Sequence, residues 1–163
     1  MGGNVSLPVI RRLYVLKPTG VWFFEKHFGG DKKGSDRFHD SGLVASFLSA
    51  AQTFVKETAG AQIRLMLLDE TALVFHQTCG GFQVVLFCDG FDVFHHAGEL
   101  LRSAKALGEQ FEKMFPDAST RDAVCCKEYE GFEPVARREV ERFARATAKN
   151  VEVLPAFFET LRG

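Results

Sequence analysis

The sequence has no excess of either charge, no long apolar run and few cysteines, and each of these absences excludes a class of protein. Lysine and arginine number 20 against 21 acidic residues, so the composition does not indicate a basic surface for nucleic acids. No apolar run reaches the roughly 18 residues of a membrane span, and no signal-peptide pattern opens the chain. The cysteines lack the spacing of a disulfide framework, so we expect reduced thiols in the cytoplasm. They are Cys79, Cys88, Cys125 and Cys126.

Signatures of catalysis are also missing. The sequence contains no dinucleotide-binding or phosphate-loop glycine motif, no nucleophile-elbow serine and no paired-histidine zinc motif. The best candidate for chemistry is the stretch "TALVFHQTCGGFQVVLFCDG", residues 71–90, which holds one histidine and two cysteines and is followed by His95 and His96. A zinc site needs two close ligand pairs, and only His76 with Cys79 has such a spacing.

The same stretch predicts strands. Apolar side chains occupy both alternating faces of residues 72–76 and 82–88, as expected for central strands covered on both sides. Cys88 falls in line with core hydrophobes and has the character of a small buried apolar residue. We therefore predict no metal, no cofactor and no catalytic activity.

Phenylalanine is abundant, with 17 residues against two tyrosines and one tryptophan. So many large apolar rings in a chain of this length indicate a thick core, an extensive interface, or both.

The order of predicted elements begins with a hairpin over residues 9–28, turning at Lys17-Pro18-Thr19-Gly20. A polar, glycine-rich loop and then a helix follow, with Asp40-Ser41 as the N-cap and Gly60 as the terminating residue. Three short extended segments come next, and then a long helix over about 93–115. The tail has an amphipathic helix in "EPVARREVERFARATA" and an apolar segment, "VEVLPAFFETLRG", which Pro155 should break into short pieces.

The helix before Gly60 carries two apolar stripes about 100° apart. The first is Leu43, Phe47, Ala50 and Phe54, and the second is Val44, Leu48, Ala51 and Val55. One sheet cannot bury both stripes. We expect Phe47 and Phe54 to be buried between helix and sheet, together with Leu86 and Phe111. The second stripe should then be covered by the tail segment Val151 to Leu161, in cis or swapped in trans, or by a partner.

The strand and helix order resembles the longin and roadblock families. The resemblance covers roughly Arg11 to Phe115 and rests on the first hairpin, the helix "LVASFLSAAQTFVKE", the strands "IRLMLLDETALVFHQ" and "FQVVLFCD", and the helix "AGELLRSAKALGEQFEKMF". Roadblock domains usually begin with a helix before the first strand. The strand here starts almost at once, which favours longin. One long helix between the second and third strands argues against the PAS sensor fold.

The resemblance implies an α+β fold: a five-stranded antiparallel sheet in the element order β-β-α-β-β-β-α, with helices on its faces and extra C-terminal helices. It divides the chain into a flexible N-terminus (1–9), a longin-like domain (10–116) and a C-terminal helical extension (117–163). The extension should pack on the domain or on a partner.

The resemblance also implies a non-catalytic interaction module in small-GTPase regulation or vesicle trafficking. Its partner would be a small GTPase or another longin or roadblock subunit, in a homo- or heterodimer. The partner groove would lie between the second stripe and the strand Gln62 to Leu68, lined by Val44, Leu48, Val55 and Arg64.

Two other functions stay open from the residues alone. One is a sensory domain that binds an apolar small molecule in a phenylalanine-rich pocket, and the other is a thiol- or metal-dependent enzyme. In addition, "MGGNVS" satisfies the N-myristoylation pattern with Gly2 as the acceptor. This lipidation would allow a cytoplasmic protein to associate peripherally with a membrane.

Overall fold

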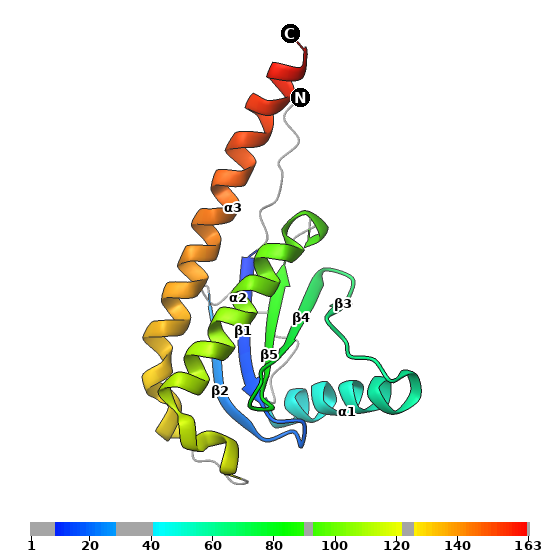
Figure 1. Cartoon of the computed structure of the whole chain (residues 1–163), viewed down its shortest axis with the longest axis vertical. Helices are drawn as coiled ribbons and strands as arrows, with labels where there is room; N and C mark the ends of the chain where they lie inside the picture. Colours follow the sequence, from blue (N-terminus) through cyan, green and yellow to red (C-terminus); the bar gives the residue numbers. More distant parts are fainter. Residues whose placement is uncertain (1–8, 29–40, 90–92, 122–125, 163) are drawn as a thin grey trace.

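The computed structural model describes residues 9–28, 41–89, 93–121 and 126–162, with side chains described within 9–28, 42–89, 95–121 and 127–149. It contains a five-stranded antiparallel sheet in the order β2-β1-β5-β4-β3 (Figure 1). The strands are β1 (Val9–Leu16), β2 (Trp22–His27), β3 (Leu65–Leu67), β4 (Thr71–Gln77) and β5 (Gln83–Asp89). The predicted sheet and element order are confirmed.

Helices cover both faces of the sheet (Figure 1). Between β2 and β3 comes α1 (Ser41–Ala59), and after β5 comes α2 (Val93–Met114). Two short 3-10 helices, η1 (Pro116–Thr120) and η2 (Cys126–Phe132), lead into α3 (Glu133–Arg162). Along β1, Leu13 and Val15 belong to the core on the side of α2 and α3, whereas Tyr14 and Leu16 belong to the core beneath α1. This alternation gives each face its own apolar layer.

Glycine ends the first hairpin turn and the first helix. Gly20 has φ +89° and Gly60 has φ +63°, values that favour glycine over residues with a Cβ. The Gly60 N–H donates to the Lys56 carbonyl at 3.0 Å, which satisfies one of the last carbonyls of α1. Both turns lie where the sequence predicts them. The predicted N-cap residue Asp40 lies outside the described residues.

The phenylalanine-rich core lies between the sheet and the pair α2–α3. Phe111 of α2 is its centre, with ring centroids 5.3 Å from Phe82, 5.3 Å from Phe132 and 6.3 Å from Phe23. All three pairs are edge-on, which is a favourable geometry for aromatic rings. The rings therefore fill this interior.

One prediction about the tail is wrong. The helix α3 is assigned without interruption from Glu133 to Arg162, through Pro155. A proline inside a helix lacks one N–H donor, but the turns before and after it can keep their own bonds. Among the residues that the structure describes, no helix combines the length and apolar content that a membrane span requires.

Candidate interaction surface

The register of the β4–β5 hairpin keeps His76 and Cys88 apart. His76 pairs with Val84, whereas Cys88 pairs with Ala72 at the other end of β4. Positions four residues apart on a strand are about 13 Å apart, too far for two side chains to share an ion. Cys79 is exposed at the turn between the strands. This stretch forms two central strands, as the alternation predicts.

Neither of the two groups with shifted pKa in this hairpin resembles a catalytic group. Burial raises the pKa of the Cys88 thiol to about 12, so this cysteine stays protonated and is a poor nucleophile. Burial, then Lys105 and Arg64, lower the pKa of His76. Within the described part of the chain, no group of three or more His, Cys, Asp or Glu could hold a metal ion. Cys125 lies outside that part.

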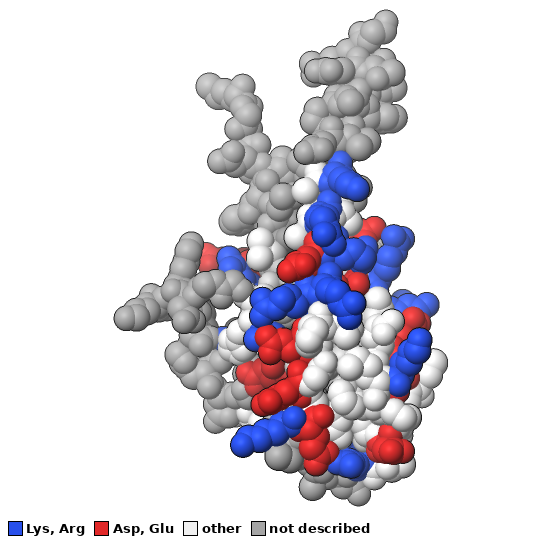
Figure 2. All heavy atoms as spheres, turned by 90° about the vertical axis from the view of Figure 1, so that its left-hand side faces the viewer, with Lys and Arg blue, Asp and Glu red and all other residues white. Residues whose placement is uncertain are grey.

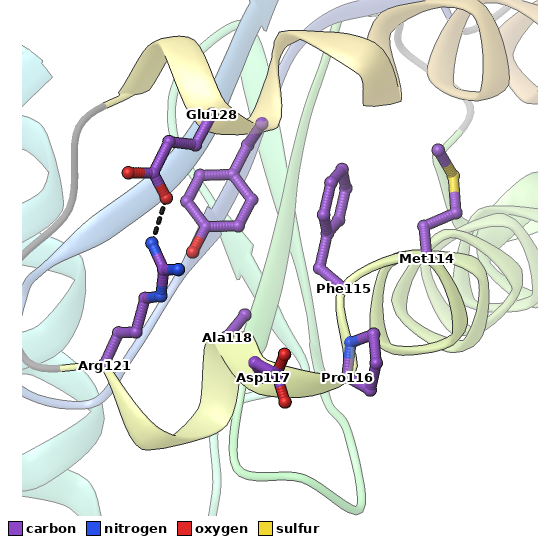
Figure 3. Close-up of a pocket in the computed structure, with 8 residues that line it drawn as sticks. Met114, Phe115, Pro116, Asp117, Ala118, Arg121 and Glu128 are labelled. Atoms are coloured by element: carbon purple, nitrogen blue, oxygen red, sulfur yellow. Dashed lines mark hydrogen bonds and ion pairs between the residues drawn. The ribbon is translucent and has the colours of Figure 1, made fainter.

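A cavity of about 260 Å³ lies between the end of α2, η1 and η2 (Figure 3). Phe115 and Tyr129 form part of its wall, and an ion pair between Arg121 and Glu128 crosses its rim. This volume is below the roughly 300–1,000 Å³ of typical ligand pockets. The sensory-domain alternative requires a pocket for an apolar molecule among the phenylalanines. The phenylalanine cluster is packed ring against ring, and the cavity beside it is small, so neither favours that alternative.

The helix α1 presents large apolar side chains to solvent. Phe47 is 53% exposed and Phe54 is 67% exposed, together with Leu43 and Ala50 on the same stripe. We name Leu43, Phe47, Ala50 and Phe54 the α1 outer stripe. The prediction that Phe47 and Phe54 pack against the sheet is therefore wrong, whereas Leu86 and Phe111 are buried as predicted.

Two polar side chains explain the error. Ser49 and Gln52 are buried on α1, where Ser49 Oγ donates to the Pro18 carbonyl. The Gln52 amide donates to the Ile63 carbonyl at 2.9 Å and accepts from the Ile63 N–H at 2.8 Å. Hydrogen bonding to backbone allows these residues to be buried. The buried side of α1 is therefore centred opposite Phe47 and Phe54, a result that an apolar pattern does not reveal.

The predicted groove residues have three different environments. Val44 and Leu48 are only 6% and 0% exposed, in the core beneath α1, so they are inaccessible to a partner. Val55 is half-buried, and Arg64 is exposed just before β3. The two hydrogen bonds between Gln52 and Ile63 tie α1 to the segment before β3. The N–H and the carbonyl of Ile63 are therefore already bonded to α1. The structure places the accessible apolar surface on the α1 outer stripe instead.

The edge strand β3 adds a second exposed apolar element. β3 is the last strand of the sheet and pairs with β4. Leu67 is 51% exposed and Leu68 is 44% exposed. In Figure 1, α1 and β3 lie on the same side of the molecule, away from α3. At the opposite edge, β2 contacts η2, and Lys26 is ion-paired with Glu133 of α3 at 2.7 Å.

The tail does not cover α1. Figure 1 shows α3 beside α2, on the other side of the sheet from α1. The predicted clasp of residues 151–161 on α1 in cis is therefore not formed, because α3 is one long helix that packs on α2. The side chains of residues 150–163 lie outside the described part of the chain.

The sequence matches no protein-family model and no curated protein. Solved structures that resemble the chain include the following three. "MglB with tetrameric arrangement" is 17% identical, covers 62% of this chain and 79% of its own, and has a TM-score of 0.39. Myxococcus xanthus MglB is 12% identical over 57% of this chain and 81% of its own, with a TM-score of 0.37. A roadblock/LC7 domain from Streptomyces avermitilis is 17% identical over 60% and 83%, also with a TM-score of 0.37.

Proposed function

We propose that this chain is a non-catalytic protein-interaction module of small-GTPase regulation or vesicle trafficking. Its partner is a small GTPase or a second longin- or roadblock-type subunit, bound through the α1 outer stripe. This proposal combines the exposed surface of α1 with the resemblance of the sequence to the longin and roadblock families. It places the protein in the cytoplasm.

The observation that carries the proposal is the exposure of Phe47 and Phe54 on one line of α1. Burying a phenylalanine side chain is favourable by roughly 1.5–3 kcal/mol, so these two rings favour a second surface that covers them. Contiguous exposed apolar residues of this kind mark interaction sites more often than they mark ordinary surface. Leu67 and Leu68 at the β3 edge would extend the same contact.

The edge strand supports association in a second way. An edge strand carries unpaired backbone groups on its outer side, which another chain can bond. β3 has three residues, Leu65–Leu67, and such a short edge limits nonspecific pairing. A partner that covers α1 could therefore also bond β3.

A capture experiment tests the proposal. Immobilised wild-type protein is incubated with lysate from its own source, loaded with GDP or with a nonhydrolysable GTP analogue, and bound proteins are identified by mass spectrometry. We expect a small GTPase or a longin or roadblock subunit on the wild type and its loss from Phe47→Glu/Phe54→Glu.

The matched control is Ser46→Glu/Thr53→Glu, which adds the same two charges at exposed positions of α1 beside the stripe. It should capture the same partner as the wild type. Equal capture by all three baits, or capture of neither class of protein, would contradict the proposal.

A further inference from the structure

The solvent side of α3 carries a line of cations, although the composition of the chain is balanced. Figure 2 shows lysine and arginine side chains gathered along α3 in the upper part of the view. Helical spacing of about 100° per residue places four of them on one line, opposite the buried residues Ala136, Phe143 and Thr147 of the same helix. We name Arg138, Arg142, Arg145 and Lys149 the α3 basic line.

Most members of the α3 basic line have no acidic partner. Arg142 is the paired member: its guanidinium lies 2.7 Å from the Glu139 carboxylate and donates to Ser103 Oγ of α2 at 3.1 Å. The hydrogen bond to Glu139 is the main cause of the raised pKa of Arg142, which stays positive. The other three members are exposed, and none forms an ion pair with a residue that the structure describes. The line therefore offers three unpaired cations to an anionic ligand.

The spacing of the line indicates the kind of anion. Successive members are three or four residues apart, so their Cα atoms rise by about 4.5–6 Å along the helix axis. Alternate side chains of an extended peptide lie about 6.6 Å apart on one side of the chain. The phosphates of one strand of duplex DNA follow each other at about 3.4 Å along its axis. The line therefore matches a row of alternating carboxylates better than a row of phosphates.

Acidic residues border the line on both sides. At about 100° per residue, Glu139 lies on one flank and Glu141 on the other, and Glu99 of α2 lies 3.8 Å from Arg142. A broad polyanion, such as a DNA duplex or an anionic membrane, would bring its own charges against these carboxylates. A single extended chain can follow the line between them. Arginine also binds a carboxylate through two parallel hydrogen bonds, so the charge pattern favours a narrow acidic polypeptide.

We propose that the α3 basic line binds an acidic segment of another polypeptide, extended along the helix with carboxylates at alternate positions. Arg138, Arg145 and Lys149 pair with these carboxylates, and complementary charge speeds the encounter of the two chains. Figure 1 shows α3 and α1 on opposite sides of the sheet. The acidic segment and the partner of the α1 outer stripe therefore occupy separate surfaces.

Fluorescence anisotropy at low ionic strength tests this proposal with the full chain and a labelled peptide, Glu-Ala-Glu-Ala-Glu-Ala-Glu. We expect saturable binding that weakens as salt is added, and none of the peptide in which glutamine replaces glutamate. Arg145→Gln/Lys149→Gln should lower the affinity about 3- to 30-fold, the loss of two exposed ion pairs (about 0.7–2 kcal/mol, at 1.4 kcal/mol per tenfold). A peptide with four consecutive glutamates should bind more weakly, because only half of them face the helix.

The control variant is Lys56→Gln/Lys113→Gln, which removes two exposed charges from α1 and from the end of α2 and should bind the peptide as the wild type does. An equal loss in this control, or equal affinity for the two arrangements of glutamate, would overturn the proposal. So would tighter binding of an oligothymidine with four phosphates, or binding of phosphatidylserine vesicles without binding of the peptide. Because the α1 outer stripe is not involved, these results do not depend on the capture experiment.

Discussion

Gly108 lies where α2 comes closest to the sheet. A Cβ at this position would be 2.5 Å from Thr78 Cγ2 and 3.3 Å from Val84 Cγ2. Real Cβ atoms essentially never approach another atom within the first of these distances, so only glycine lets α2 pack this closely. Gly98, in the same helix, has nothing within 4 Å of the corresponding position.

These two glycines provide a matched pair of substitutions. Gly98→Ala should raise the free energy of unfolding by roughly 0.5–1 kcal/mol, because alanine favours the helix over glycine. Gly108→Ala gains the same preference but forces α2 from the sheet, and overpacking costs about 1–3 kcal/mol. Urea denaturation measures both. A stabilised Gly108→Ala would show that α2 is not seated on Thr78 as described.

At the scale of the element, α1 shows how far the sequence predicts structure. The helix and its end at Gly60 follow from local signals, and the central strands follow from apolar residues on both faces of residues 71–90. The side of α1 that faces the sheet does not follow from them. It depends on Ser49 and Gln52, which bond the backbone of Pro18 and Ile63, contacts between segments far apart in the chain.

The accessible apolar side of α1 differs from the predicted one for the same reason. The apolar pattern predicts a partner for Val44 and Leu48, which lie in the core, and a place in the core for Phe47 and Phe54, which are exposed. The resemblance to a family predicted the fold and a binding role. It could not predict which stripe of one helix is accessible, because both stripes are apolar.

Adjacent residues of α1 test the revised orientation. Leu48→Ala should lower the free energy of unfolding by about 2–5 kcal/mol, because it leaves a cavity beneath the helix. Phe47→Ala should change it by less than about 1 kcal/mol, since its ring is 53% exposed. Chemical denaturation at low protein concentration makes the comparison without association. The reverse ranking would mean that α1 is rotated relative to the present structure.

At the scale of the whole molecule, the two faces of the sheet are covered differently. On one face, α2 and α3 enclose the phenylalanine cluster, and α3 contributes the buried residues Ala136, Phe143 and Thr147. On the other face, one helix forms a thinner layer and exposes its outer stripe. We therefore assign the proposed partner to α1.

Removal of the residues after Asn150 separates the fold from the end of α3. Figure 1 shows the last turns of α3 extending past the sheet and α2, so the truncated chain should unfold within about 1 kcal/mol of the full chain. Its binding of a hydrophobic dye should not rise, because α3 does not cover α1. Marked destabilisation or increased dye binding would show that residues 151–163 shield part of the domain.

Site-specific photo-crosslinking tests the central claim, that the α1 outer stripe is covered by another polypeptide. Benzoylphenylalanine replaces Phe54 in one protein and Thr53 in a second, so that the same group lies on the stripe or beside it. After illumination in the source lysate, we predict a discrete crosslinked product from position 54 and little or none from position 53. The absence of a product at position 54, or equal products from both positions, would contradict the account.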